Sequence, residues 1–270
     1  MCDKRSAERN TNREGEASGG ATQICAILTI IYIWLTIKKL LIRVEEIMSP
    51  ALEARKITKK YIDGDKSHNV LMDVNLQIER GKSALLLGNS GCGKSTFLQI
   101  AGLIQEPTSG EIWIDGQNAT KMSVNKRNLL LREKIGFIYQ FHYLFNDFTA
   151  KENLIIPQLI CNVDKKTAEK NADNMLKMLG LSHRADAMPN QLSGGERQRI
   201  AIARAIIKKP LIILADEPTG NLDNEMSAFV VNEMLELVKK NNIALLMVSH
   251  CHDFNDRFDD IYQIENGCLH

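Results

Sequence analysis

The sequence lacks an excess of charge of either sign. It contains 34 Lys and Arg against 33 Asp and Glu, which leaves a formal net charge of +1. Proteins that bind nucleic acid usually carry a basic field, so we expect no nucleic-acid partner. The six cysteines also lack the CxxC pairs and the His–Cys spacing of zinc sites or disulfide frameworks. A reducing, cytosolic environment is therefore expected.

Long hydrophobic runs are scarce, and only one of them resembles a membrane segment. Residues 1 to about 20 are charged and rich in Gly and Ser, without an apolar period, so we expect disorder there. The apolar run Ile24 to Ile37 follows. As a helix starting at Ala21 it would reach only about 25 Å, short of the roughly 30 Å hydrocarbon core. Spanning a membrane would require residues beyond Lys39.

The first 47 residues have three explanations. A secretory signal fits the length of the apolar run, but no clean small-residue cleavage site follows it, so export is disfavoured. A genuine membrane anchor and a later start at Met48 both stay open, and the later start is favoured because a globular pattern begins there. We expect an N-terminal extension over 1–47 and one globular domain over 48–270.

From Ala51 onward, strand patterns alternate with helical patterns. The runs LIILAD (211–216) and IALLMVS (243–249) are continuous rather than alternating, as expected for central parallel strands covered on both faces. Helical patterns occupy 94–103, 165–179, 196–208 and 224–240. This alternation predicts an α/β fold with a parallel sheet.

A glycine-rich segment, GNSGCGKST, matches the phosphate-binding pattern GxxxxGK[ST] between a short apolar strand and an amphipathic helix. Its glycines let backbone N–H groups converge on phosphate oxygens, and the following helix points its positive end at the same charge. We expect Lys94 to reach the β- and γ-phosphates, Ser95 to complete a Mg²⁺ shell, and Cys92 to be a small space-filler. The candidate nucleotide-binding residues of this P-loop are Gly88, Asn89, Ser90, Gly91, Cys92, Gly93, Lys94, Ser95 and Thr96.

Two acidic residues end a later apolar strand. Asp216 lies at the carboxyl end of LIILAD, where open α/β sheets bind their ligands, and it is a natural partner for Mg²⁺. Glu217 follows directly and is a candidate general base for the water that attacks the γ-phosphate. Together with the P-loop, this pair predicts an ATPase site.

A P-loop and an acidic strand end are shared by kinases, GTPases, helicases and transporters. The segment LSGGERQ (192–198) distinguishes among these classes. Ser193, Gly194 and Gly195 form a second anion cradle at the amino end of a helix. The segment resembles the LSGGQ signature of ABC ATPases, in which the signature of one subunit faces the P-loop of another. The resemblance implies a homodimer around ATP.

The resemblance to ABC ATPases implies further roles. Tyr61 matches the aromatic residue that stacks on adenine, and Gln140 matches the glutamine that senses Mg²⁺ and the attacking water. Asp223 matches the residue that communicates across the dimer, and His250 matches the switch histidine that contacts the γ-phosphate and orients Glu217. It also implies a P-loop NTPase core with a parallel sheet, a small antiparallel β subdomain, and a helical signature subdomain at about 141–196.

Within this family, the stretch GFIYQFHYLFNDFTAKEN (136–153) is similar to the corresponding stretch of LolD-like lipoprotein-releasing ATPases. The resemblance implies an ATP-hydrolysing translocase subunit that releases lipoproteins from the bacterial inner membrane. It places that subunit at the cytoplasmic face, attached through two integral membrane permease subunits that bind the lipoprotein cargo. The motif ADEPTGNLD agrees but is shared with macrolide-exporter and cell-division relatives, which stay alternatives.

A dense cluster of aromatic and apolar residues follows Gln140, in what is expected to be a surface loop. Some of these side chains will pack inward, but an exposed patch that remains is a docking site by default. The resemblance implies that the coupling helix of a permease docks here, near Phe141–Phe148. The cluster comprises Phe141, Tyr143, Leu144, Phe145 and Phe148.

A soluble ABC ATPase acting on DNA or ribosomes is a further alternative, but such proteins usually carry two ATPase domains or a coiled-coil insertion.

Overall fold

The computed structural model describes residues 32–34, 36–37, 49–64, 66–220, 222 and 224–270. The chain divides into two units, Met1–Met48 and Ser49–His270. Residues 32–34 and 36–37 of the first unit have helical backbone, whereas the disorder expected over 1–20 and most of the apolar run lie outside the described residues. No helix among the described residues is long and apolar enough to cross a membrane.

A four-stranded antiparallel sheet begins the second unit. Its strand order is β2-β1-β4-β5. Alternate residues of β1, including Leu52 and Ala54, are fully or almost fully buried, because one face of this sheet packs on the core. The sheet corresponds to the small antiparallel β subdomain. Its strands are β1 (Leu52–Asp63), β2 (Lys66–Ile78), β4 (Ser109–Ile114) and β5 (Gln117–Asn118).

A six-stranded sheet forms the centre of the second unit, with the order β10-β9-β3-β8-β7-β6. The pairs from β9 to β6 are parallel, and only β10 pairs antiparallel to β9. The continuous apolar runs of the sequence form β7 and β8 in the middle. The strands are β3 (Ser83–Leu87), β6 (Ile135–Ile138), β7 (Ile212–Asp216), β8 (Ala244–Ser249), β9 (Asp260–Glu265) and β10 (Cys268–Leu269).

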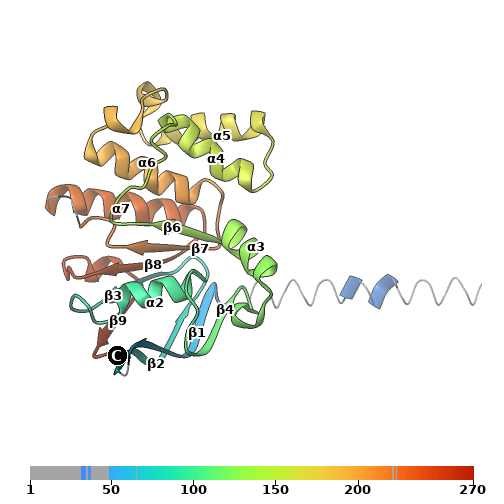
Figure 1. Ribbon diagram of the computed structural model, residues 1–270. Coiled ribbons are helices and arrows are strands. Elements are labelled where there is room, and N and C mark those ends of the chain that lie inside the picture. Colours follow the sequence, from blue (N-terminus) through green and yellow to red (C-terminus); the bar gives the residue numbers. More distant parts are fainter. Residues whose placement is uncertain (1–31, 35, 38–48, 65, 221, 223) are drawn as a thin grey trace, which may run out of the picture. The chain divides into compact units, whose positions relative to one another are not determined.

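Helices cover both faces of the central sheet. Figure 1 shows α4, α5 and α6 grouped on one side of the sheet, with the strands β1, β2 and β4 on the other. The helices are α2 (Lys94–Ala101), α3 (Val124–Lys134), α4 (Ala150–Ile160), α5 (Lys165–Met178), α6 (Gly194–Ile206) and α7 (Asn224–Lys240). Short 3₁₀ turns in the described part of the chain are η1 (Ala119–Lys121), η2 (Ser182–Arg184), η3 (Pro189–Gln191) and η4 (Asn255–Arg257).

Two hydrophobic cores lie on opposite faces of the central sheet. Leu85 and Leu87 of β3 belong to the core shared with α4 to α7, whereas Ala84 and Leu86 belong to the core shared with α2 and the antiparallel sheet. This division follows from the two-residue period of a strand. It explains why the central strands are apolar except at their ends, where Ser83, Asp216 and Ser249 lie. The parallel central sheet with helices on both faces is the α/β fold predicted from the sequence.

Candidate functional site

The carboxyl ends of the central strands meet at one edge of the sheet. Leu87 of β3 lies opposite Ser249 of β8, Asp216 of β7 lies opposite Val248, and Ile138 of β6 pairs with Ala215. The segments that follow these strands carry the P-loop, Glu217, His250 and Gln140. The sheet therefore gathers residues from four distant parts of the sequence at the place where open α/β sheets bind ligands.

The P-loop leads from β3 into α2 with a backbone that only glycine accommodates. Gly93 has a φ of 109°, and a Cβ added there would lie 2.8 Å from the Val70 carbonyl oxygen. The Lys94 side chain is buried, and its Nζ donates to the carbonyl oxygens of Gly88 at 2.6 Å and Asn89 at 2.9 Å. The cation is thus held inside the loop, where a phosphate-binding site needs positive charge.

The rest of the P-loop lines a hollow of about 640 Å³ beside β2 and the β9–β10 turn. Its walls include Asn89, Ser90, Gly91 and Cys92. Cys92 is partly buried and packs against the hydrophobic core, as a space-filler does, while Thr96 in the first turn of α2 is partly buried. These contacts keep the loop close to the sheet.

The Ser95 hydroxyl and the Asp216 carboxylate lie together. Ser95 Oγ donates to Asp216 Oδ1 at 3.1 Å, although the two residues are 121 positions apart in the chain. Burial raises the pKa of the Asp216 carboxyl, Ser95 opposes this by hydrogen bonding, Glu217 reinforces it through its charge, and Lys94 lowers it. A hydroxyl and a carboxylate side by side are two of the oxygen ligands that Mg²⁺ prefers.

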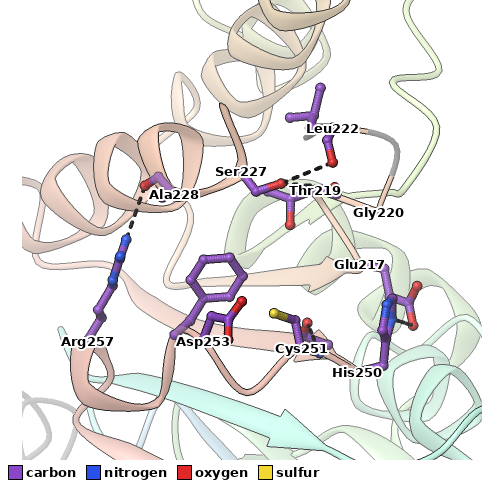
Figure 2. A pocket seen from close by; sticks show the side chains of 12 residues that line it. Glu217, Thr219, Gly220, Leu222, Ser227, Ala228, His250, Cys251, Asp253 and Arg257 are labelled. Atoms are coloured by element: carbon purple, nitrogen blue, oxygen red, sulfur yellow. Dashed lines mark hydrogen bonds and ion pairs between the residues drawn. The ribbon is translucent and has the colours of Figure 1, made fainter. Parts of the chain in front are cut away.

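Glu217 and His250 form a second pair beside the first. Glu217 Oε1 lies 3.2 Å from His250 Nδ1. The two side chains point toward each other (Figure 2). Glu217 has a φ of 43°, a left-handed backbone conformation that is uncommon for a residue with a side chain. Both residues line a cavity of about 180 Å³, together with Gly220 and the start of α7 at Ser227 and Ala228. A carboxylate held this way can act as a general base.

The other predicted residues divide into three groups. Gln140 contacts the segment after Glu217, since its Nε2 lies 2.9 Å from where a Cβ of Gly220 would stand. Tyr61 is exposed at the end of β1, where its hydroxyl and the Gln105 side chain hydrogen-bond at 3.0 Å. Asp223 lies outside the described residues. Gln140 thus joins the site, whereas the contacts of Tyr61 do not test a role with adenine.

The signature segment starts α6 with a complete capping box. Ser193 Oγ accepts from the Glu196 backbone N–H at 3.2 Å, and Glu196 Oε2 accepts from the Ser193 N–H at 2.7 Å. This backbone hydrogen bond, with help from Ser193 Oγ and Arg184, lowers the pKa of Glu196 to about 2 against the cost of burial. Gly194 and Gly195 are partly exposed, and nothing lies within 4 Å of where a Cβ of Gly194 would stand.

Gln198 was not predicted from the sequence. It is 1 % exposed, and its Nε2 donates to the Pro218 carbonyl oxygen at 2.5 Å. The hydrogen bond ties α6, which carries the signature, to the residue directly after Glu217. The only signal in the sequence was a polar residue on the apolar face of a helix, and that pattern does not identify its partner.

The aromatic segment after Gln140 is exposed and firmly anchored. Phe141, Tyr143, Phe145 and Phe148 are exposed, whereas Leu144 is buried in the core. The fully buried Asn153 holds the segment: its Oδ1 accepts from the Phe145 N–H at 2.8 Å, and its Nδ2 donates to the carbonyl oxygens of Phe145, Phe148 and Thr149. The aromatic rings are therefore displayed on a fixed backbone.

A P-loop, an acidic strand end and a second glycine-rich helix start on this fold define an ABC-type ATPase. Residues 71–220 match the family model described as ABC transporter. The chain therefore belongs to the ABC transporter family, as an ATP-hydrolysing, LolD-like subunit, and this prediction is confirmed.

Two curated relatives are named lipoprotein-releasing system ATP-binding protein LolD. The one from Saccharophagus degradans is 41% identical, covering 82% of this chain and 97% of the relative. The one from Rickettsia typhi is 45% identical, covering 80% and 95%. Among solved structures, the ATP-binding cassette MJ0796, a dimer bound to ADP and Pi, is 33% identical with a TM-score of 0.73, covering 81% of this chain and 96% of that one.

Proposed function

We propose that the chain is the ATP-hydrolysing subunit of a transporter that releases lipoproteins from the bacterial inner membrane toward the outer membrane. The observation that carries this proposal is the similarity to LolD proteins of 41% and 45% identity, over 97% and 95% of their length. Similarity of this extent covers the nucleotide site and the aromatic segment after Gln140 together. A shared nucleotide site alone would support ATP hydrolysis but not this cargo.

The P-loop and the Ser95–Asp216 pair fit Mg-ATP. Lys94 supplies a buried cation among loop carbonyls, and the 3.1 Å contact between Ser95 and Asp216 joins a hydroxyl to a carboxylate. The described residues contain no group of three or more His, Cys, Asp or Glu that could bind a metal by itself. That suits Mg²⁺, which keeps water and phosphate oxygens in its shell. The bound ion would neutralise phosphate charge.

Glu217 is proposed as the general base that accepts a proton from the attacking water. His250 holds one oxygen of this carboxylate at 3.2 Å and so fixes its orientation. Gln140 lies against Gly220. We propose that it senses the γ-phosphate and its Mg²⁺, and that its position changes the aromatic segment Phe141–Phe148 that follows Gln140 in the chain. Each of these residues follows a different strand, so small shifts of the sheet edge change their alignment.

A homodimer is proposed because one chain carries two phosphate-binding devices. The P-loop residues line one hollow with β2 and the β9–β10 turn, whereas Gly194 of the signature lines another with Phe141 and Arg197. Two copies arranged head to tail would place each signature, and Asp223, against the other copy's nucleotide. The similar cassette MJ0796 is a dimer bound to ADP and Pi, which supports dimer formation by this chain.

The exposed aromatic segment Phe141–Phe148 is proposed as the docking surface for an integral membrane permease subunit. The two copies of the dimer would thus bind two permease subunits. Four exposed aromatic rings on an anchored backbone suit a protein partner. Docking there would hold the subunit at the cytoplasmic face of the inner membrane as a peripheral protein. The lipoprotein cargo would contact the permease rather than this chain, and no nucleic-acid partner is proposed.

Depletion of the chain in its own host tests this function. Lipoproteins are expected to accumulate in the inner-membrane fraction, and wild-type protein should restore their transfer, whereas Glu217→Gln should not. Unchanged distribution of lipoproteins after depletion would remove the proposed cargo. Purification from membranes with DNA or ribosomes, and without a multi-span subunit, would favour the soluble alternative.

A further inference from the structure

Three side-chain amides are buried in the part of the chain that the structure describes, each at most 1% exposed. They belong to Asn153, Gln158 and Gln198. Asn153 donates from its nitrogen and accepts at its oxygen, as buried amides usually do. Gln158 does the same, because its Nε2 donates to two backbone carbonyl oxygens at 3.0 Å and 3.1 Å and its Oε1 accepts from Asn171 Nδ2 at 2.8 Å. Gln198 differs from both.

The Gln198 side chain is satisfied on one side only. Its Nε2 donates to the Pro218 carbonyl oxygen at 2.5 Å, whereas its Oε1 has no hydrogen-bond partner within the described residues. The orientation of this amide is fixed, because the Pro218 carbonyl can only accept. A buried oxygen without a partner costs free energy, which offsets part of what the single hydrogen bond contributes. Stability of the fold is therefore a weaker reason for a glutamine here than at Gln158.

The hydrogen bond holds the middle of the tight turn that begins at Glu217. The Gly220 N–H donates to the Glu217 carbonyl oxygen at 3.0 Å, which closes a β-turn. Pro218 and Thr219 lie at the centre of this turn, and the peptide between them carries the carbonyl that Gln198 binds. Rotation of this central peptide converts one type of β-turn into another, so Gln198 holds the turn in one form. Both ends of the turn line the cavity shown in Figure 2.

Gln198 also lies one helical turn after the glycines of the signature. Gly194 and Gly195 begin α6, and Gln198 follows Gly194 by four residues, on the same side of the helix. Backbone hydrogen bonds and the capping box of Ser193 with Glu196 make the start of α6 stiff. A shift of the helix start on binding phosphate would therefore move Gln198 and, through it, the turn that carries the proposed base.

We propose that Gln198 is a positioning residue, which aligns Glu217 with the attacking water when the start of the same α6 binds the nucleotide of the other copy. This inference rests on the proposed function, in which Glu217 is the base and two copies share the nucleotides. In that arrangement, the signature and the Glu217 of one chain serve different nucleotides. Gln198 thus makes hydrolysis of one nucleotide depend on the presence of the other.

The variant Gln198→Leu tests this role, because it removes the donor and nearly keeps the size of the side chain. For the full chain, kcat is expected to fall roughly tenfold or more, since a misaligned base is slow. KM for ATP should stay within about twofold, because the P-loop is unchanged. Gln158→Leu is the matched control at the other buried glutamine. It should lower the melting temperature more than Gln198→Leu does, and it should leave kcat within about twofold.

A double-mutant cycle shows whether Gln198 acts through Glu217. In a Glu217→Gln background, Gln198→Leu should change the remaining turnover by no more than about twofold, because the base that it aligns is already gone. A residue that only supports the fold would lower turnover by the same factor in both backgrounds, and that result would overturn the proposal.

The dependence of turnover on ATP concentration tests the link between the two nucleotides. The wild-type chain is expected to give a sigmoidal curve, because one nucleotide promotes hydrolysis of the other. Gln198→Leu should make the curve hyperbolic. Curves of the same shape for both chains would show that Gln198 does not link the nucleotides. Gln198→Met and Gln158→Met, with flexible side chains, replace the leucine variants if either of those does not fold.

The outcomes separate this inference from the proposed function. If Glu217→Gln hydrolyses ATP like the wild type, the proposed role of Glu217 fails. If Glu217→Gln is inactive but Gln198→Leu keeps the kcat and the curve of the wild type, the positioning role of Gln198 is wrong while the proposed function stands.

Discussion

The P-loop helix α2 and the signature helix α6 both begin with glycines, yet their first turns differ. The N-cap of α2 is Gly93, which offers no side-chain cap, and its first turn contains no acidic residue. The N-cap of α6 is Ser193, which forms a capping box with Glu196 and so places an acid in the first turn. One helix start is left open for an anion, and the other is already partly satisfied.

This difference predicts an order of events. An uncapped helix start with a buried lysine beside it attracts phosphate strongly, so α2 should bind ATP in a single chain. In α6 the Glu196 carboxylate occupies part of the positive end of the helix, beside the partly exposed Gly194 and Gly195. We expect α6 to add to a phosphate that another copy already holds, rather than to bind one by itself.

The largest effect is expected when the proposed general base is removed while the starts of α2 and α6 stay unchanged. Glu217→Gln preserves the size of the side chain but not its basicity, so turnover should fall about a hundred- to ten-thousandfold, the usual contribution of a general base. ATP binding should persist, and an ATP-bound dimer should accumulate. Steady-state hydrolysis and light scattering with ATP measure the two properties. Turnover near that of the wild type would exclude Glu217 as the base.

A negative charge placed at the start of α6 should lower ATP turnover by the dimer without lowering the stability of the single chain. Gly194→Glu has room for its side chain, and glutamate in a helix is more favourable than glycine by roughly 0.5–1 kcal/mol. Turnover should nevertheless fall roughly a hundredfold, because the carboxylate would face phosphate.

Gly194→Ala is the matched control, and it should lose much less activity than Gly194→Glu. Both variants should bind ATP as monomers like the wild type. Equal turnover in the two variants would mean that negative charge at α6 does not matter.

The smallest effect concerns the capping box. Glu196→Ala removes the carboxylate and its hydrogen bond to Ser193 N–H, so unfolding should become easier by about 1 kcal/mol. Glu196→Gln keeps the geometry and loses the charge, so it should cost less.

The pKa of Glu196 is lowered in the folded chain from 4.5 to about 2, so its charge stabilises the fold above pH 4.5. The stability difference between wild type and Glu196→Gln should shrink as pH falls through this range. Denaturant unfolding at several pH values measures it, and a difference that grows toward low pH would contradict this assignment.

Motifs predicted the parts of the site that depend on local backbone geometry. The P-loop before α2 and Ser193 at the start of α6 are each encoded within a few residues, so the sequence pattern was sufficient to place both at helix starts. The meeting of Ser95 with Asp216 followed from the expected parallel sheet, since strand ends share an edge. The fold class and the family are confirmed by the match of residues 71–220 to the ABC transporter family and by the similarity to a solved ATP-binding cassette.

Contacts between distant surface segments were not predicted. Arg204 donates to Tyr143, 61 residues away, and no periodicity marks that pairing. Gln198 and Asn153 look like ordinary polar residues of helices, although each is buried and ties one segment to another. Helix α4 also contains Pro157 in its interior, which disfavours a helix by propensity, and tertiary packing overrides this.

Mixing two inactive variants tests most directly the claim that each nucleotide lies between α2 of one chain and α6 of another. Lys94→Ala disables the P-loop and Gly194→Glu disables the signature, so neither full-length chain should turn over ATP alone. A mixed dimer would combine one intact P-loop with one intact signature, so an equal mixture should recover about a quarter of wild-type turnover if the two sites act independently. A mixture no more active than its separate components would contradict the shared site.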